Sequence, residues 1–307
     1  MKKVFIDGSA GTTGLRIHER LASREDIELL SIDEMQRKDP VARAEMLNAA
    51  DIAFLCLPDA AAREAVTFVE NPNTVIIDTS TAHRTDDDWC YGFAELPGAR
   101  ERIASAKRIS NPGCHATGFI AVVAPLVEAG LLDKSAKLSS VSLTGYSGGG
   151  KKMIAEYESG QHDNSGSQYA LGQSHKHLPE MMKYCSLENA PVFSPVVVPH
   201  YSGMQTTVML HGDTLKHGNL EDVMECLRDA YSKEGLVKFV KDPSVCGFLS
   251  STSMTGRDDL TVSAFGNDER IILVSAFDNL GKGASGAAIQ NMNLALGCEQ
   301  TRSLITA

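Results

Sequence analysis

The chain has 307 residues, with 29 Lys and Arg against 39 Asp and Glu, so its formal net charge is −10. This length favours two domains or one large α/β unit, because single hydrophobic cores rarely grow larger. A hydrophobic content of 43% and a charged content of 22% are those of a globular protein and exclude disorder or a fibrous repeat. Because binding to nucleic acid or to an anionic membrane surface needs a surplus of Lys and Arg, neither is predicted as a partner.

The cysteines and the apolar segments predict a cytoplasmic location. Seven cysteines are scattered singly, which excludes a disulfide framework and a zinc ribbon. The apolar run before Asp7 has only three consecutive residues, at positions 4–6, which is too few for a signal peptide. The longest uncharged apolar stretch, residues 116–127, is shorter than the roughly 20 residues of a membrane span.

The first 110 residues alternate strand-like apolar runs with helical patterns. Strands are expected at residues 4–6, 27–32, 52–57 and 75–77, and helices at residues 15–21, 41–49 and 60–69. This alternation is typical of an α/β fold with a doubly wound, Rossmann-type parallel sheet. Such sheets bind ligands beyond the carboxyl ends of their strands.

The pattern changes after Cys114 and predicts a second, α+β domain. One apolar helix is expected at residues 116–130. Strands of a mostly antiparallel sheet are expected at residues 138–143, 192–198, 206–210, 260–265 and 271–277. Asn219 is expected to cap a helix that covers one face of this sheet, and a last helix is expected at residues 284–296.

A glycine-rich turn follows the first predicted strand. Gly8, Gly11 and Gly14 are spaced three apart, and Ser9, Thr12 and Thr13 lie between them. Glycines in this position let backbone N–H groups approach a phosphate at the positive end of the next helix. We therefore predict a dinucleotide site; the alternative is a tight turn without a ligand.

The residues after the second predicted strand do not decide between two nicotinamide cofactors. Asp33 is near the position at which an acidic residue binds a ribose 2′-hydroxyl and favours NAD. Arg37 and Lys38 are suited to the additional phosphate of NADP, although such charges are often only solvated.

Cys114 is the one cysteine in a setting that favours catalysis. The turn-forming run from Ser110 to Gly113 leads directly into the predicted apolar helix, so Cys114 is expected at the helix N-terminus. The helix dipole and free N–H groups there stabilise a thiolate, and the same N–H groups suit an oxyanion.

A thiolate that forms acyl intermediates needs an acid/base group, and His175 and His177 are the candidates. In an extended segment these two side chains would point the same way. Pro179 favours an extended residue before it and a helix start at its own position, so Glu180 would lie in a first helical turn and could orient an imidazole. Metal ligation or a solvated loop are the alternatives; no further metal ligand has an informative spacing. His115 is expected to act only indirectly.

A second glycine-rich loop covers residues 145–152. Ser147 and Gly148 lie in it, and Lys151 and Lys152 follow. Backbone donors and cations in this order suit an anionic substrate group; the alternative is a flexible surface loop.

These segments together resemble the short form of the N-acetyl-gamma-glutamyl-phosphate reductase family of arginine biosynthesis. The resemblance covers essentially the whole chain, and its most specific motifs are Ser-Asn-Pro-Gly-Cys at 110–114 and His-x-His-x-Pro-Glu at 175–180. The other matching segments are residues 8–14, 57–59, 78–84, 91–96, 145–148 and 278–286. Lys176 stands where the family has Arg.

The resemblance implies reduction of an acyl phosphate with NADPH, through a thioester on Cys114 and with His177 as the preferred acid/base. His175, Glu180 and Tyr169 would support them. It also implies cofactor contacts from Ser80, Asn279, Gly281 and Gly283, and substrate contacts from Asn111, Ser147, Gly148 and Tyr169.

The resemblance further implies a domain division and an oligomer. A cofactor domain would comprise residues 1–112 and 281–307, and a catalytic domain residues 113–280. The sheet of the second domain would form a homodimer or homotetramer interface. Aspartate-semialdehyde dehydrogenase and acetylaminoadipyl-phosphate reductase share the layout and stay open as alternatives. A non-catalytic NADPH-binding redox sensor that uses Cys114 as its reactive thiol also stays open.

Overall fold

The computed structural model describes residues 1–162, 164–233 and 235–306, and its chain divides into two compact units. The first unit comprises Met1–Pro112 and Ala284–Leu304. The second comprises Gly113–Gly283 and the residues from Ile305 onward. The chain therefore returns to the first unit at residue 284, three residues after the predicted 281. Ala307, the end of that predicted segment, lies outside the described residues.

The first unit is built on a parallel sheet with the strand order β2-β1-β3-β4-β6-β5 in the described chain. Its strands are β1 (Lys2–Asp7), β2 (Ile27–Leu30), β3 (Ile52–Leu55), β4 (Val75–Asp78), β5 (Cys90–Tyr91) and β6 (Arg108–Ser110). Every pairing in this sheet is parallel. The predicted doubly wound sheet is confirmed, and the short strands β5 and β6 extend it beyond the predicted four strands.

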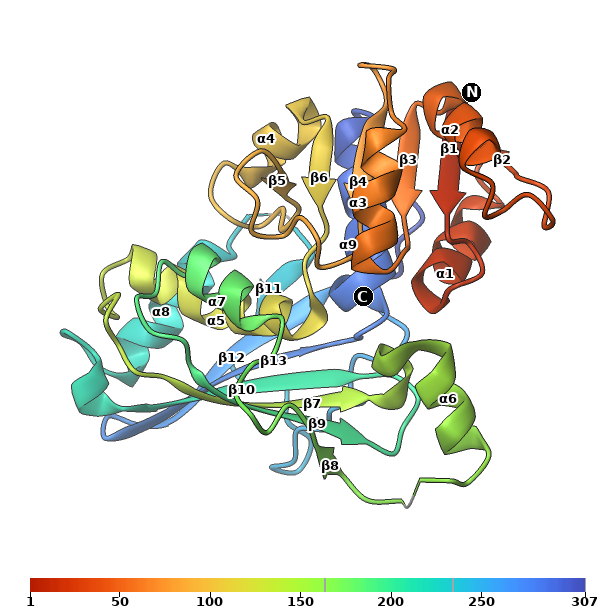
Figure 1. The fold of residues 1–307 in the computed structure, drawn as a ribbon. Helices are drawn as coiled ribbons and strands as arrows, with labels where there is room; N and C mark the ends of the chain where they lie inside the picture. Colours follow the sequence, from red (N-terminus) through yellow and green to blue (C-terminus); the bar gives the residue numbers. More distant parts are fainter. Residues whose placement is uncertain (163, 234, 307) are drawn as a thin grey trace. The chain divides into compact units, whose positions relative to one another are not determined.

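Helices cover both faces of this sheet. Its helices are α1 (Thr12–Leu21), α2 (Pro40–Ala49), α3 (Asp59–Thr67), α4 (Ala99–Ser105) and α9 (Gly286–Ala295). Val4 and Ile6 of β1 pack in one core cluster with residues of α1, α4 and α9, whereas Phe5 packs with residues of α2 and α3 on the other face. Figure 1 shows α2 and α3 in front of the sheet and α9 behind it. This two-sided burial explains why the strands are continuous apolar runs.

A buried ion pair fixes α2 to the end of β1. Asp39 caps α2 by accepting hydrogen bonds from two backbone N–H groups, and Pro40 begins the helix. Arg43, one turn later, contacts the buried carboxylate of Asp7 at 2.9 Å. Burial nevertheless raises the pKa of Asp7, although Arg43 opposes that shift.

The second unit contains a mixed sheet with the strand order β11-β12-β13-β10-β7-β9-β8 among its described residues. Its strands are β7 (Ser139–Gly145), β8 (Ser167–Gln168), β9 (Val192–Val198), β10 (Met204–His211), β11 (Val237–Phe239), β12 (Leu260–Asn267) and β13 (Arg270–Phe277). Four of its neighbouring pairs are antiparallel, and the pairs β7-β9 and β11-β12 are parallel. The expected mostly antiparallel sheet is confirmed.

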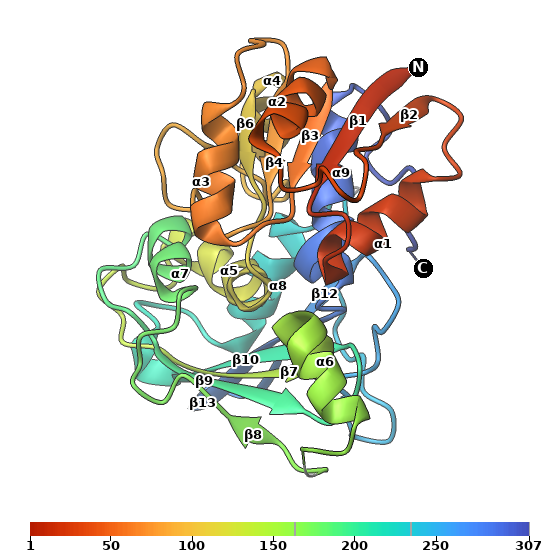
Figure 2. The ribbon, with the colours of Figure 1, turned by 45° about the vertical axis from the view of Figure 1, so that its right-hand side comes forward.

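Helices pack against one face of this sheet. They are α5 (Cys114–Glu128), α7 (Leu178–Tyr184) and α8 (Leu220–Ala230). Figure 2 shows all three on the same side of the strands, whereas α6 (Gly150–Glu158) lies at the end of β7. Asn219 caps α8 in a reciprocal capping box with Asp222, as its sequence predicts. None of the described helices is long and apolar enough to cross a membrane.

Candidate active site

Cys114 is the first residue of α5. Gly113 before it has an extended backbone and provides no side-chain cap, so no side chain covers the first N–H groups of the helix in that role. The rest of α5 is almost entirely buried, and Cys114 itself is half-buried. The helix starts two residues before the predicted position, which puts the sulfur at the positive end of the helix dipole. A thiolate is stabilised in such a position.

Gly283 provides the space beside Cys114. It lies in a single π-helical turn, Gly281–Ser285, and a Cβ added to it would lie 3.0 Å from the Cβ of Cys114. The N–H of Gly283 donates to the carbonyl of Asp278 at 3.0 Å. Gly281 is equally constrained, because an added Cβ would lie 1.9 Å from the carbonyl oxygen of Arg257. Both glycines, predicted as cofactor contacts, belong to the second unit.

His175 and His177 lie together, but not in an extended segment. Their ring centroids are 4.7 Å apart in an edge-to-face arrangement. His177 has helical backbone angles, its N–H donates to Nδ1 of His175 at 3.1 Å, and Leu178 donates to the carbonyl of His175. The expected extended backbone is therefore wrong, and a tight turn brings the two rings together. Leu178 begins α7, so the expectation of an extended residue before Pro179 is also wrong.

Glu180 lies in the first turn of α7, as predicted, and is fully buried. Its carboxylate accepts a hydrogen bond from the backbone N–H of Gly113 at 3.0 Å. This bond ties α7 to the turn that precedes Cys114. Glu180 thus has a backbone partner in the turn before Cys114, and the expectation that it orients an imidazole stays a prediction.

His115 is the centre of the histidine cluster. Its ring centroid lies 5.4 Å from that of His175 and 5.6 Å from that of His177. Its Nε2 is 2.7 Å from the hydroxyl of Tyr169. Burial, with a smaller contribution from the charge of His175, lowers the pKa of His115 to about 3, so this imidazole is neutral at pH 7. The expectation that it acts indirectly agrees with its 2% exposure.

Tyr169 connects this cluster to the cysteine. Burial raises the pKa of its phenol, and the charge of Cys114 raises it further. The phenol is therefore neutral and lies within electrostatic reach of the sulfur. Tyr169 carries no recognisable pattern in the sequence, and only the family resemblance pointed to it.

The glycine-rich loop after β7 folds against Asn279. The Nδ2 group of Asn279 donates to the hydroxyl of Ser147 at 3.0 Å, and its Oδ1 accepts from the N–H of Gly203. A Cβ added to Gly148 would lie 3.6 Å from Nδ2 of the same asparagine. Ser147, Gly148 and Asn279 are thus brought together. Lys152, by contrast, is largely exposed and contacts Glu156 on its own helix.

The first unit contains a glycine turn that fits a phosphate. Gly8 has a φ of +91°, and a Cβ there would lie 2.3 Å from the carbonyl oxygen of Cys56. A Cβ added to Gly14 would lie 2.5 Å from the carbonyl oxygen of Gly8. The hydroxyl of Thr12, at the start of α1, is buried and has no hydrogen-bond partner in the described chain. A close backbone turn, a helix N-terminus and an unpaired hydroxyl are the features that a dinucleotide phosphate requires.

The other predicted cofactor residues of this unit have local partners. Asp33 accepts from the N–H of Met35, and Arg37 forms an exposed ion pair with Glu34 at 2.6 Å. Lys38 is exposed in the same loop. The loop thus presents its basic residues to solvent, and the carboxylate of Asp33 stabilises the loop itself.

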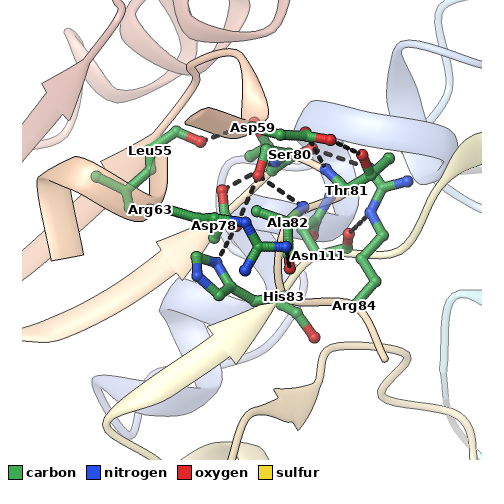
Figure 3. Close-up of polar contacts among 12 residues, drawn as sticks. Leu55, Asp59, Arg63, Asp78, Ser80, Thr81, Ala82, His83, Arg84 and Asn111 are labelled. Atoms are coloured by element: carbon green, nitrogen blue, oxygen red, sulfur yellow. Dashed lines mark hydrogen bonds and ion pairs between the residues drawn. The ribbon is translucent and has the colours of Figure 1, made fainter. Parts of the chain in front are cut away.

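A polar cluster lies beyond β4, in a segment that the family resemblance included but whose contacts the sequence did not reveal (Figure 3). Buried Asp78 accepts from both the N–H and the hydroxyl of Ser80, and lies 2.7 Å from Nδ1 of His83. The His83 ring stacks on Trp89. Arg84 donates to the carbonyl oxygens of Thr79 and Asn111. A signal was present: charged and polar residues follow a buried strand at the edge where parallel sheets bind ligands.

The side-chain amide of Asn111 is engaged within the first unit. Its Nδ2 donates to the carbonyl of Ala284 at 3.0 Å, and its Oδ1 accepts from Asn291 at 3.1 Å. Asn111 is 1% exposed. Both polar atoms of its side chain thus have protein partners, and the substrate contact of Asn111 stays a prediction.

The fold and this site define a class. Residues 8–106 match the family model described as semialdehyde dehydrogenase, NAD binding domain, and residues 114–279 match semialdehyde dehydrogenase, dimerisation domain. An aspartate semialdehyde dehydrogenase II from Vibrio cholerae has the same fold, with a TM-score of 0.72 and 17% identity over 97% of this chain and 98% of that one. The chain is an oxidoreductase of the semialdehyde dehydrogenase class.

Closer relatives narrow the class to one family. A protein of Nostoc sp. named N-acetyl-gamma-glutamyl-phosphate reductase 2 is 44% identical over 98% of this chain and 99% of its own length. The N-acetyl-gamma-glutamyl-phosphate reductase of Sinorhizobium fredii is 46% identical over 96% and 98%. This chain belongs to the N-acetyl-gamma-glutamyl-phosphate reductase family, which confirms the resemblance.

The unpaired hydroxyl of Thr12 leads to a prediction on cofactor binding. In Thr12→Val, we expect the affinity for NADPH to fall by about 10- to 100-fold, because a hydrogen bond to a charged group contributes about 1.5–3 kcal/mol. The stability of the ligand-free protein should not fall, since the hydroxyl has no protein partner. Fluorescence titration with NADPH measures the effect. Thr214→Val in the second unit is the control, and an unchanged affinity in Thr12→Val would contradict the phosphate assignment.

Proposed function

We propose that the chain reduces N-acetyl-L-glutamyl 5-phosphate to N-acetyl-L-glutamate 5-semialdehyde, with release of phosphate, in arginine biosynthesis. The observation that carries the proposal is a half-buried cysteine that begins a buried helix in a member of this reductase family. A thiolate in that position is a competent nucleophile at neutral pH.

The chain's residues account for the acyl-transfer steps. The thiolate of Cys114 attacks the acyl carbon, phosphate leaves, and a thioester forms. Bound NADPH supplies the hydride that reduces this thioester. The first N–H groups of α5 stabilise the tetrahedral oxyanion, and His177 protonates the sulfur as the aldehyde forms. His175 positions His177 by accepting a hydrogen bond from the backbone N–H of that residue. Glu180 positions the start of α5 by accepting one from the N–H of Gly113.

The proposed cofactor is NADP(H). The glycine turn of the first unit fits its phosphates, and a solved relative of the same fold, from Candida albicans, is described with NADP; it has a TM-score of 0.70 and 16% identity over 96% of this chain and 98% of that chain. Arg37 and Lys38 are exposed cations that suit the additional phosphate. The proposed cofactor contacts are Gly8, Ser9, Gly11, Thr12, Thr13, Gly14, Arg37, Lys38, Ser80, Asn279, Gly281 and Gly283.

The proposed substrate contacts are Ser147, Gly148 and Tyr169, with Asn111 supporting the turn before Cys114. Ser147 and Gly148 lie in a glycine-rich loop whose backbone suits an anionic group. None of the seven cysteines, all of which lie in the described part of the chain, forms a disulfide, and we propose a reducing, cytoplasmic location on that basis.

Cys114→Ala tests the reaction. We expect the wild-type enzyme to oxidise NADPH with N-acetylglutamyl phosphate in preference to aspartyl phosphate and acetylaminoadipyl phosphate. Cys114→Ala should abolish this turnover and still bind NADPH, because only the nucleophile is lost. Absorbance at the NADPH band measures turnover, and mass spectrometry detects the acyl group on Cys114 when the reduced cofactor is withheld.

Cys185→Ala is the matched control, since burial raises the pKa of that thiol and makes it inert. Turnover that survives in Cys114→Ala would reject the mechanism. A preference for another acyl phosphate would reject the substrate and leave the mechanism in place.

His177→Ala tests the acid/base assignment. We expect turnover to fall by roughly 10²- to 10⁴-fold, the usual loss when a positioned proton donor is removed. Steady-state kinetics over a range of pH measure it, with His175→Ala as the comparison. A near-normal rate in His177→Ala, combined with a large loss in His175→Ala, would move the role to His175.

We propose further that the second unit forms a homodimer or a homotetramer through the outer face of its sheet. Val192, Ser139, Met209, Ile272 and Phe265 lie in register across five neighbouring strands. Val192, Met209 and Ile272 are 62%, 41% and 39% exposed, which is high for apolar side chains in the middle of a sheet. The family model that matches this unit is a dimerisation domain.

Met209→Asp should weaken that assembly, because a charge would be buried without a partner. We expect sedimentation velocity to show a smaller particle than the wild-type oligomer at equal concentration. Met35→Asp, on the fully exposed loop of the first unit, is the control. An unchanged mass in Met209→Asp would place the interface elsewhere.

A further inference from the structure

A chain of hydrogen bonds runs from the core of the second unit to Tyr169. The hydroxyl of Thr206 on β10 is 2.8 Å from that of Ser142 on β7. The hydroxyl of Ser142 is 2.7 Å from Nδ1 of His115, and Nε2 of His115 is 2.7 Å from the hydroxyl of Tyr169. Thr206, Ser142 and His115 are buried, whereas Tyr169 is partly exposed.

The hydrogens of this chain can run in two directions, because each hydroxyl carries one hydrogen and a neutral imidazole carries one. His115 is neutral, since burial lowers its pKa to about 3. If Tyr169 donates to His115, then His115 donates to Ser142 and Ser142 donates to Thr206. If Thr206 donates to Ser142, then Ser142 donates to His115 and His115 donates to Tyr169.

The first direction leaves a buried donor unsatisfied. The Thr206 hydroxyl has no other hydrogen bond among the described residues, and the nearby hydroxyl of Ser275 has no hydrogen-bond partner there either. Gly118 of α5 closes the space above them, because a Cβ added to it would lie 2.5 Å from Oγ1 of Thr206. A buried hydroxyl without an acceptor costs about 1–3 kcal/mol, so the second direction is favoured.

In the second direction Thr206, Ser142 and His115 each donate to the next residue of this hydrogen-bond chain. The hydroxyl hydrogen of Tyr169 is then the one that has no acceptor within the chain of hydrogen bonds. That phenol is at the partly exposed end and is bonded to His115, which directly follows Cys114 in the first turn of α5. The charge of Cys114 also contributes to the raised pKa of the phenol. His175 also faces the Tyr169 ring, with the two ring centroids 5.6 Å apart, and the rings of His175 and His177 contact His115. Glu180 accepts from the N–H of Gly113, just before Cys114.

We propose that His115 is a positioning residue that turns the hydroxyl hydrogen of Tyr169 toward the sulfur of Cys114. Tyr169 then donates a hydrogen bond to the thiolate before the reaction, and to the oxygen of the acyl group once that group is bound to the sulfur. The second role rests on the proposed function, whereas the first does not. Ser142 and Thr206 fix the tautomer of His115 that makes this possible.

The pH dependence of Cys114 alkylation tests the proposal without substrate or cofactor. Iodoacetamide reacts with the thiolate, and peptide mass spectrometry separates Cys114 from the six other cysteines. Tyr169→Phe should raise the alkylation midpoint by about one pH unit, because a hydrogen bond that favours the ionised form is lost. His115→Phe should raise it by a similar amount, and the double variant should shift it no further than either single variant.

Two further variants separate positioning from packing. His115→Gln places an N–H donor where Nε2 lies and should restore most of the wild-type midpoint. Ser142→Ala removes the donor to Nδ1 and should shift the midpoint upward by a smaller amount, in a protein whose cluster is otherwise intact. His200→Phe, which removes an imidazole that contacts Ser251, is the control and should leave the midpoint unchanged.

A midpoint unchanged in Tyr169→Phe would overturn the proposal, as would shifts that add in the double variant. If His115→Phe does not fold, an unchanged midpoint in Ser142→Ala overturns it equally. The alkylation test is independent of the substrate assignment. If the enzyme prefers another acyl phosphate, the shifts of the alkylation midpoint persist. If only the hydrogen-bond direction is wrong, the assay with N-acetylglutamyl phosphate still succeeds.

Discussion

The close packing of α5 on the sheet of the second unit is the constraint on which the site depends. Gly118 lets the helix approach until its backbone covers the hydroxyls of Thr206 and Ser275, and nearly every residue of the helix is buried. Dense packing holds the first turn of the helix in place, so the Cβ of Cys114 stays beside Gly283 and the N–H of Gly113 stays bonded to Glu180. Reactivity at one end of the helix therefore follows from dense packing along the rest of it.

Much of the fold could be predicted because its signals are local. Alternating strands and helices defined the first unit, and the capping residue Asn219 defined α8 to within one residue. Cys114 was recognisable because a turn-forming sequence precedes a long apolar segment, a pattern that has one physical interpretation. The strands β5, β6, β8 and β11 were missed because two or three residues cannot display a periodicity.

The site could be predicted as a set of residues but not as a geometry. His175 and His177 were expected on one side of an extended segment, yet a turn held by hydrogen bonds to His175 unites them. The side-chain partners of Asn111 lie far away in the sequence, and those of Asp78 lie in a turn that the sequence did not reveal. Residue spacing predicts neither kind of contact. The helical angle between neighbours predicted an indirect role for His115, which stays a prediction, but that angle could not reveal the contact of His115 with Tyr169.

The return of the chain to the first unit has a consequence for synthesis. Ala288, Ile289 and Met292 of α9 complete the core that covers one face of the parallel sheet, although they lie near the end of the sequence. A ribosome must therefore translate the strands and helices of the second unit, and then α9, before the nucleotide-type unit can close this face. The strands and helices of the second unit lie between residues 113 and 283 and are all translated before α9. Nascent chains therefore expose one apolar surface of the parallel sheet until α9 has been translated.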